Sequence, residues 1–89
     1  MELSTQTWTV EVLLSERDGV THAEARLLSG LATPLTATGE ARLSPHDPVD
    51  VAEIGYERAA ARALTRLGQA LLQTADADVE ELLHDLYRT

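Results

Sequence analysis

Residues 10–27, with the sequence VEVLLSERDGVTHAEARL, decide the fold of this chain. Apolar and polar residues alternate on both sides of a central Asp18-Gly19, which is the pattern of two half-buried strands. Asp-Gly favours a two-residue type I′ turn, since both residues tolerate the positive φ angles that this turn requires. The stretch therefore predicts a β-hairpin.

Pairing outward from the turn tests the register of this hairpin in two ways. One face receives three apolar pairs: Val10 with Leu27, Val12 with Ala25, and Leu14 with Ala23. On the other face Glu11 meets Arg26, which is a match of opposite charges. Because the apolar and the charged pairs select the same register, we expect it in the folded protein.

A third strand is expected at about residues 36–44. Charge selects its register, because pairing with the second strand can place Arg26 opposite Glu40. The same register places Glu24 opposite Arg42. The inward residues of this strand are mostly small, which leaves a trough that a helix can approach closely: Ala37, Gly39, Ala41 and Leu43.

Beyond residue 50 the apolar spacing changes from two to three and four, which is the period of a helix. Asp50 and Glu53 fit a capping box, so a long helix is expected over residues 51–74. At about 1.5 Å per residue, this helix is long enough to cover strands of about nine residues. Its expected core-facing residues form one stripe: Ala60, Leu64, Leu67 and Leu71.

A short second helix is expected over residues 79–87. Asp76 or Asp78 starts it, and Asp78 and Glu81 fit another capping box. Together these elements predict an α+β fold of the order β-β-β-α-α. The strands form an antiparallel meander, the long helix packs on one face, and the short helix closes one end. The 89 residues are expected to form a single domain, 1–89.

The composition excludes several kinds of site. The chain has no Cys and no Lys, and its seven cations are all Arg. We therefore expect no disulfide, no thiolate metal site, no cysteine nucleophile and no lysine Schiff base. His22, His46 and His84 do not show the spacing of zinc ligands. Since no catalytic motif is present either, we expect a non-enzymatic protein without a metal or cofactor.

Charge and hydropathy limit the location and the partners. The first residues lack the basic and apolar runs of a signal peptide, and no apolar stretch is long enough to span a bilayer. We therefore expect a cytoplasmic protein that does not bind membranes. The net charge of −8 opposes the approach of nucleic acid at long range.

Three arginines recur every four residues in the predicted long helix. Arg58, Arg62 and Arg66 are expected to form a ridge opposite the apolar stripe. None of them has an acidic residue four positions away, so they form no ion pair at this spacing that would stabilise the helix. A solvated helix face is the simpler interpretation, and contact with RNA phosphates is the alternative.

The predicted meander leaves one sheet face and two strand edges open. Leu13 and Leu28 lie on that open face among threonines, so they are candidate contact residues for a partner. Self-association would cover the face or an edge, and we therefore expect a homodimer; another protein is a possible partner for the same surface. Trp8 is in phase with the inward residues and is expected to seal one end of the core.

Several segments together resemble a family of short actinobacterial proteins known as a domain of unknown function. The most specific is Glu53-Ile54-Gly55-Tyr56-Glu57-Arg58-Ala59-Ala60-Ala61-Arg62-Ala63-Leu64. The others are Trp8-Thr9-Val10, Asp18-Gly19 and Asp47-Pro48, so the resemblance covers most of the chain. It implies a fold like the double-stranded-RNA-binding domain, with three antiparallel strands and helices on one face.

The resemblance also implies a biological setting. Some members of the family are dimers, are compared with ribosome hibernation factors, and are associated with dormancy or low oxygen. The expected function is therefore a small stress- or dormancy-associated interaction module that acts as a homo-oligomer. The alternative is a ribosome- or RNA-binding factor that uses Arg58, Arg62 and Arg66. Hibernation factors are rich in Lys and Arg, whereas this chain is acidic and has no Lys, so we favour the first.

Overall fold

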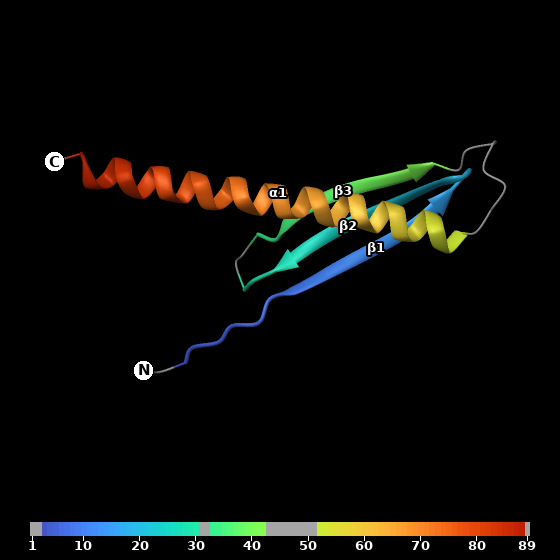
Figure 1. Cartoon of the computed structure of the whole chain (residues 1–89), viewed down its shortest axis with the longest axis horizontal. Helices are drawn as coiled ribbons and strands as arrows, with labels where there is room; N and C mark the ends of the chain where they lie inside the picture. Colours follow the sequence, from blue (N-terminus) through green and yellow to red (C-terminus); the bar gives the residue numbers. More distant parts are fainter. Residues whose placement is uncertain (1–2, 31–32, 43–51, 89) are drawn as a thin grey trace.

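The computed structural model describes residues 3–30, 33–42 and 52–88 (Figure 1). Their elements follow the order β1-β2-β3-α1, and one antiparallel sheet contains the strands in sequence order. The α+β class and the meander are therefore confirmed. The bounds of the elements are Thr9–Arg17 for β1, Val20–Leu28 for β2, Leu35–Arg42 for β3 and Ala52–Leu86 for α1.

The hairpin of β1 and β2 has the predicted register. Val12 lies opposite Ala25, and Glu11 lies opposite Arg26. The turn has the predicted positive φ angles, 53° at Asp18 and 76° at Gly19. A two-residue turn fixes the register of the strands it joins, and for this reason the local sequence was sufficient here.

The predicted register of β3 is wrong by four residues. Glu40 lies opposite His22 instead of Arg26, and Ala23 lies opposite Gly39. The cause is the approach of α1 to Gly39, where an added Cβ would lie 2.5 Å from the backbone nitrogen of Ala63. This contact fixes β3 under the helix, whereas exposed charge pairs contribute little. A shift of four residues keeps the same side chains inward, so Ala37, Gly39 and Ala41 still face the helix; Leu43 lies outside the described residues.

The prediction of two helices is also wrong, because α1 is one continuous helix of 35 residues. Asp78 and Glu81 lie in its interior, where they cap nothing. No Gly or Pro interrupts residues 72–86. Aspartate costs a helix interior only about 0.7 kcal/mol relative to alanine, so two of them do not break it. At the other end, Asp50 lies outside the described residues.

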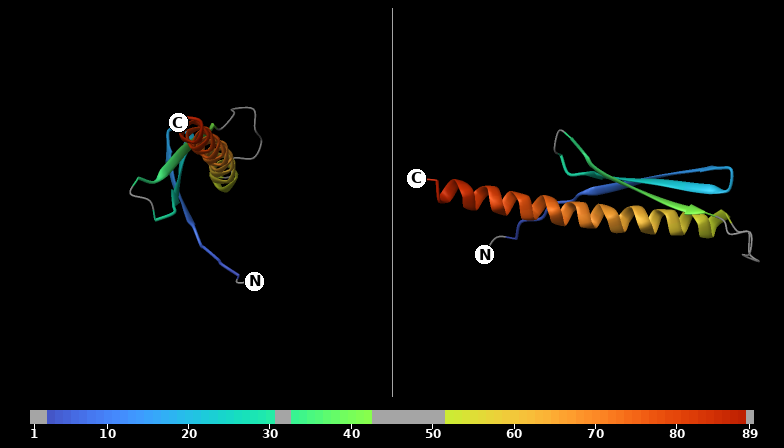
Figure 2. Two further views of the ribbon diagram at one scale, coloured as in Figure 1. Left: turned by 90° about the vertical axis from the view of Figure 1, so that its left-hand side faces the viewer. Right: turned by 90° about the horizontal axis from the view of Figure 1, so that it is seen from above.

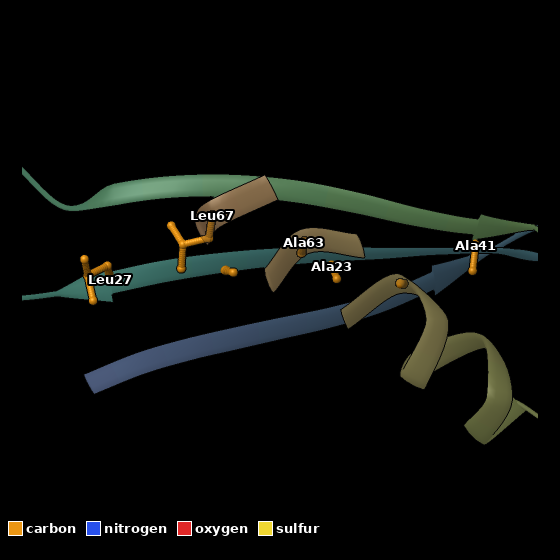
Figure 3. Packing of buried hydrophobic residues seen from close by; sticks show 7 residues of the cluster. Ala23, Leu27, Ala41, Ala63 and Leu67 are labelled. Carbon is orange, nitrogen blue, oxygen red and sulfur yellow. The ribbon is translucent and has the colours of Figure 1, made fainter. Parts of the chain in front are cut away.

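The sheet-facing stripe of α1 differs from the prediction by about one position. Ala59, Ala63 and Leu67 are buried and Leu71 is partly buried, whereas Leu64 is 44% exposed and Ala60 is only half-buried. Alanine at two successive turns lets the helix backbone approach the sheet, which larger side chains would prevent. Figure 3 shows Leu67 and Ala63 of α1 facing Leu27 and Ala23 of β2.

The core is small. In the described residues, the buried apolar cluster consists of five alanines and two leucines, and no large side chain is fully buried. Burying a leucine stabilises a fold by about 1.5–3 kcal/mol, and alanine contributes much less. The members are Ala23, Ala25, Leu27, Ala41, Ala59, Ala63 and Leu67.

The helix is longer than the sheet that it covers. Thirty-five residues span about 52 Å, whereas nine-residue strands span about 30 Å. The orange and red part of α1, which ends at the C-terminus, therefore projects past the sheet (Figures 1 and 2). Across the sheet, α1 packs on β3 and β2 and makes few contacts with β1.

Candidate interaction surface

The inner face of β1 is largely uncovered, because α1 lies over the other two strands. Val10 and Leu14 are 41% and 43% exposed although they point to the same face as the buried residues of β2. Trp8, which precedes β1 in the same phase, is 50% exposed, so its predicted role as a core aromatic is wrong. We call Trp8, Val10 and Leu14 the β1 face.

A second apolar stripe runs along α1 beyond the sheet. Its residues alternate at spacings of three and four, which is the a/d pattern of a coiled coil. The large members are strongly exposed; Leu82, for example, is 64% exposed. We call this set the C-terminal stripe: Leu72, Ala75, Val79, Leu82 and Leu86.

Arg62 and Arg66 show which flank of α1 faces which strand. Arg62 Nη1 donates a hydrogen bond to the Glu40 carbonyl at 2.5 Å, and Arg66 Nη1 donates one to the Thr38 carbonyl at 2.9 Å. This flank therefore lies over the edge strand β3. Each residue turns the helix by about 100°, so Leu64 lies about 200° from Arg62. Leu64 is consequently on the β1 side, whereas Leu72 and Val79 of the C-terminal stripe lie about 160–180° around the helix from the buried Ala63 and therefore face away from the sheet.

The predicted position of the arginine ridge is therefore wrong. Arg62 and Arg66 do not lie opposite the core stripe, because their long side chains run along the helix flank to main-chain acceptors of β3. Two carbonyls of this edge are occupied by arginine, which makes β3 a poor site for pairing with another strand. Arg58 lies one turn earlier and is exposed.

Leu13 and Leu28 do not form one patch. Both are exposed, but Leu13 lies opposite Glu24 and Leu28 lies opposite Thr9. Between them Arg26 Nε donates to Glu24 Oε1 at 2.6 Å, a hydrogen bond that raises the pKa of Arg26. An ion pair thus separates the two leucines, and their role in partner binding stays a prediction.

The polar side chains give little support for other kinds of site. His22 Nδ1 lies 3.3 Å from Glu40 Oε1 on the exposed outer face. In the described residues, no three His, Cys, Asp or Glu side chains gather closely enough to hold a metal ion. None of the helix that the structure describes is apolar enough over a sufficient length to cross a bilayer. His46 lies outside the described residues.

The comparisons with known proteins assign this chain to a family. A model of the Rv2632c-like family matches residues 6–88, which contain all four elements. The chain belongs to the Rv2632c-like family. The relatives include an uncharacterized protein of Mycobacterium bovis, which is 42% identical over 79 residues, or 89% of this chain and 82% of the relative.

The Mycobacterium tuberculosis member after which the family is named is also similar. The uncharacterized protein Rv2632c is 40% identical over 79 residues, or 89% of this chain and 83% of its own length. Its crystal structure superimposes with a TM-score of 0.83 at 39% identity and covers 94% of this chain and 98% of the other. The expected resemblance to a small actinobacterial family is thus confirmed. Both relatives are described as uncharacterized, so membership brings no named activity.

The C-terminal stripe is the part of the surface that the sequence-based prediction missed. The signal was present, because Leu72, Val79 and Leu86 recur every seven residues. A helix break predicted between residues 74 and 79 divided this repeat between two elements. A test of the heptad pattern across the supposed break would have found it.

Proposed function

We propose that this protein is a non-enzymatic interaction module that acts as a homodimer. The observation that carries this proposal is the imbalance between a small core and a large exposed apolar surface. In the described residues, five alanines and two leucines are buried, whereas ten large side chains of the β1 face and α1 remain exposed. These ten are Trp8, Val10, Leu14, Ile54, Leu64, Leu72, Val79, Leu82, Leu83 and Leu86.

The shape of the chain supports the same proposal. A compact domain of 89 residues has an expected radius of gyration of about 12 Å. The value for this structure is 18.1 Å, with extents of 62 × 31 × 23 Å. A single copy therefore leaves apolar area in water that a compact fold would bury. Covering an area on the order of 800 Å² on each partner is typical of a stable protein–protein interface.

The proposed stress- or dormancy-associated role comes from the family resemblance alone. The proposed cytoplasmic location is supported by the absence of Cys. The likeness of the fold to the double-stranded-RNA-binding domain is also part of the proposal. The sheet of three antiparallel strands with a helix on one face agrees with that fold, although the described residues contain one helix instead of several.

The RNA-binding alternative gains no support from the geometry. Two of its three arginines donate hydrogen bonds to β3 carbonyls, so they are not directed away from the protein towards a phosphate backbone. The net charge of −8 opposes the same approach. We therefore do not propose ribosome or RNA binding.

Light scattering after size-exclusion chromatography tests the homodimer. We expect a mass of twice the 9.7 kDa of one chain at low and at high micromolar concentration. Exposed apolar side chains on two elements drive this association, so it should persist at high salt. A mass of one chain at the highest concentration would contradict the proposal.

A further inference from the structure

We propose that the outer face of the sheet, which is the face opposite α1, binds a basic segment of a partner protein and receives an arginine side chain in a hollow between the three strands. α1 covers only one face of the sheet, and no other helix or strand of the described residues lies on the outer face (Figure 2). The inference goes beyond the proposed homodimer, because neither the β1 face nor α1 is part of this surface.

The hollow is formed by side chains of all three strands and opens to solvent. Its volume of about 440 Å³ lies within the range of about 300–1,000 Å³ that is usual for ligand pockets, so one long side chain fits in it. The side chains that line it on the outer face are Leu13 and Ser15 of β1, His22 and Glu24 of β2, and Thr38 and Glu40 of β3.

The strand register brings two carboxylates to the border of this hollow. His22 lies opposite Glu40, and Glu24 lies opposite Thr38. Glu24 and Glu40 are therefore diagonal neighbours, and the Cα atoms of such neighbours lie about 7–8 Å apart in an antiparallel pair. Long side chains reach across this distance. A guanidinium group between the two carboxylates can bridge them, because its N–H donors point outwards in a planar fork.

Each of these carboxylates has an acceptor left for a second cation. Arg26 Nε donates to Glu24 Oε1 at 2.6 Å, and His22 Nδ1 lies 3.3 Å from Glu40 Oε1. Within the described part of the chain, these contacts use one oxygen of each carboxylate and leave the other oxygen open to solvent. Glu40 is 60% exposed, and its neighbour His22 carries a charge only when it is protonated. Glu40 is therefore the stronger anchor for a cation from outside.

Charge decides which class of partner fits this surface. The lining contains two Glu and no Arg, a net charge of −2 with His22 neutral. The charge of −8 on the whole chain attracts cations at long range and opposes the approach of anionic partners. A basic protein segment is therefore complementary to the hollow.

The other lining residues favour arginine over lysine. Ser15 and Thr38 add hydroxyl groups that accept hydrogen bonds, so the hollow offers acceptors from all three strands. Arginine has five N–H donors in a fixed plane, whereas lysine has three donors on one nitrogen. Leu13 is 48% exposed and gives the methylene groups of an arginine an apolar contact. This assigns a contact to one of the two leucines that were predicted to bind a partner.

A titration followed by NMR tests the site on the ¹⁵N-labelled full chain. The probe is a capped peptide with one arginine between glycines, and we expect it to shift the amide signals of residues 13–15, 22–24 and 38–40. The same peptide with lysine should bind ~5-fold more weakly, since it forms fewer hydrogen bonds, and the peptide with glutamine should cause no shifts. Shifts confined to the acidic residues 76–85 of α1 would indicate attraction by net charge alone and would contradict the inference. Equal binding of the arginine and lysine peptides would contradict it as well.

A pair of variants separates the hollow from the total charge. Glu40→Gln keeps the shape of the side chain and should weaken binding of the arginine peptide by ~10-fold, because a charge-assisted hydrogen bond is lost. Glu16→Gln removes the same charge from an exposed position on the other face of the sheet and should bind as the wild type does. Equal affinity of E40Q and the wild type would overturn the proposed site.

Light scattering on the same proteins distinguishes this inference from the homodimer. The wild type, E40Q and E16Q should have the same mass, because the outer face takes no part in the proposed self-association. Loss of peptide binding in E40Q at an unchanged mass would therefore support the hollow as a separate site. A monomeric wild type would contradict the homodimer alone, since the hollow is complete in one copy.

Discussion

At the scale of single residues, two glycines of this chain differ in what surrounds the position of the missing side chain. Gly39 lies under α1, where an added Cβ would meet the Ala63 nitrogen at 2.5 Å and the Ala59 carbonyl oxygen at 2.6 Å. Gly68 lies on the other side of the same helix with open space around it. The first glycine permits the contact between sheet and helix, and the second is unexplained until a partner is considered.

Gly39→Val should destabilise the protein strongly. The helix backbone must move away to accommodate the side chain, and overpacking of this kind costs about 1–3 kcal/mol or more. Urea unfolding at a fixed protein concentration measures the loss. Thr38→Val is the matched control, because Thr38 is exposed on the opposite face; its effect should stay within about 0.5 kcal/mol. Equal stability of G39V and the wild type would show that the close approach is not needed.

Single residues also show where sequence reasoning succeeded and failed. Asp18-Gly19 fixed the first hairpin, since turn type and strand register are local properties. The pairing of Arg26 with Glu40 failed, because exposed ion pairs contribute little and Arg26 finds Glu24 in its own strand. The decisive contact joins Gly39 to a helix about twenty residues later, which no pattern within β3 indicates.

At the scale of elements, α1 combines two segments with different surroundings. Its first half packs on the sheet through Ala59, Ala63 and Leu67, whereas its second half projects with the C-terminal stripe exposed. The helical period predicted the sheet-facing residues of the first half to within one position. The end of the helix could not be predicted from capping residues, because an Asp followed by a Glu three residues later also occurs inside helices.

Leu67→Asp should unfold the chain. Leu67 is one of only two buried leucines in the described core, and an unpaired carboxylate there costs several kcal/mol out of a total of about 5–15 kcal/mol. Circular dichroism should show the loss of most of the helical signal. A variant that keeps a wild-type spectrum and a cooperative thermal transition would contradict the assigned core.

At the scale of the whole molecule, the elongated shape follows from a helix that is longer than its sheet. The fold class was predictable, because the change of hydrophobic period needs no tertiary information. The candidate surface was predictable only in part. Leu13 and Leu28 were expected as contact residues on the open face, and the structure places the ion pair of Glu24 and Arg26 between them. The uncovered β1 face depends on where α1 crosses the sheet, which is a property of the assembled fold.

Sedimentation equilibrium on three proteins tests the central claim, which is association through the exposed part of α1. The proteins are the wild type, Leu82→Asp and Gln73→Asp, which carry the same new charge on the stripe and away from it. Leu82 is 64% exposed, so one copy loses no core contact when it is replaced. We expect twice the 9.7 kDa of one chain for the wild type and Q73D, and one chain for L82D. A wild type of one chain, or an L82D variant that dimerises as the wild type does, would contradict the account.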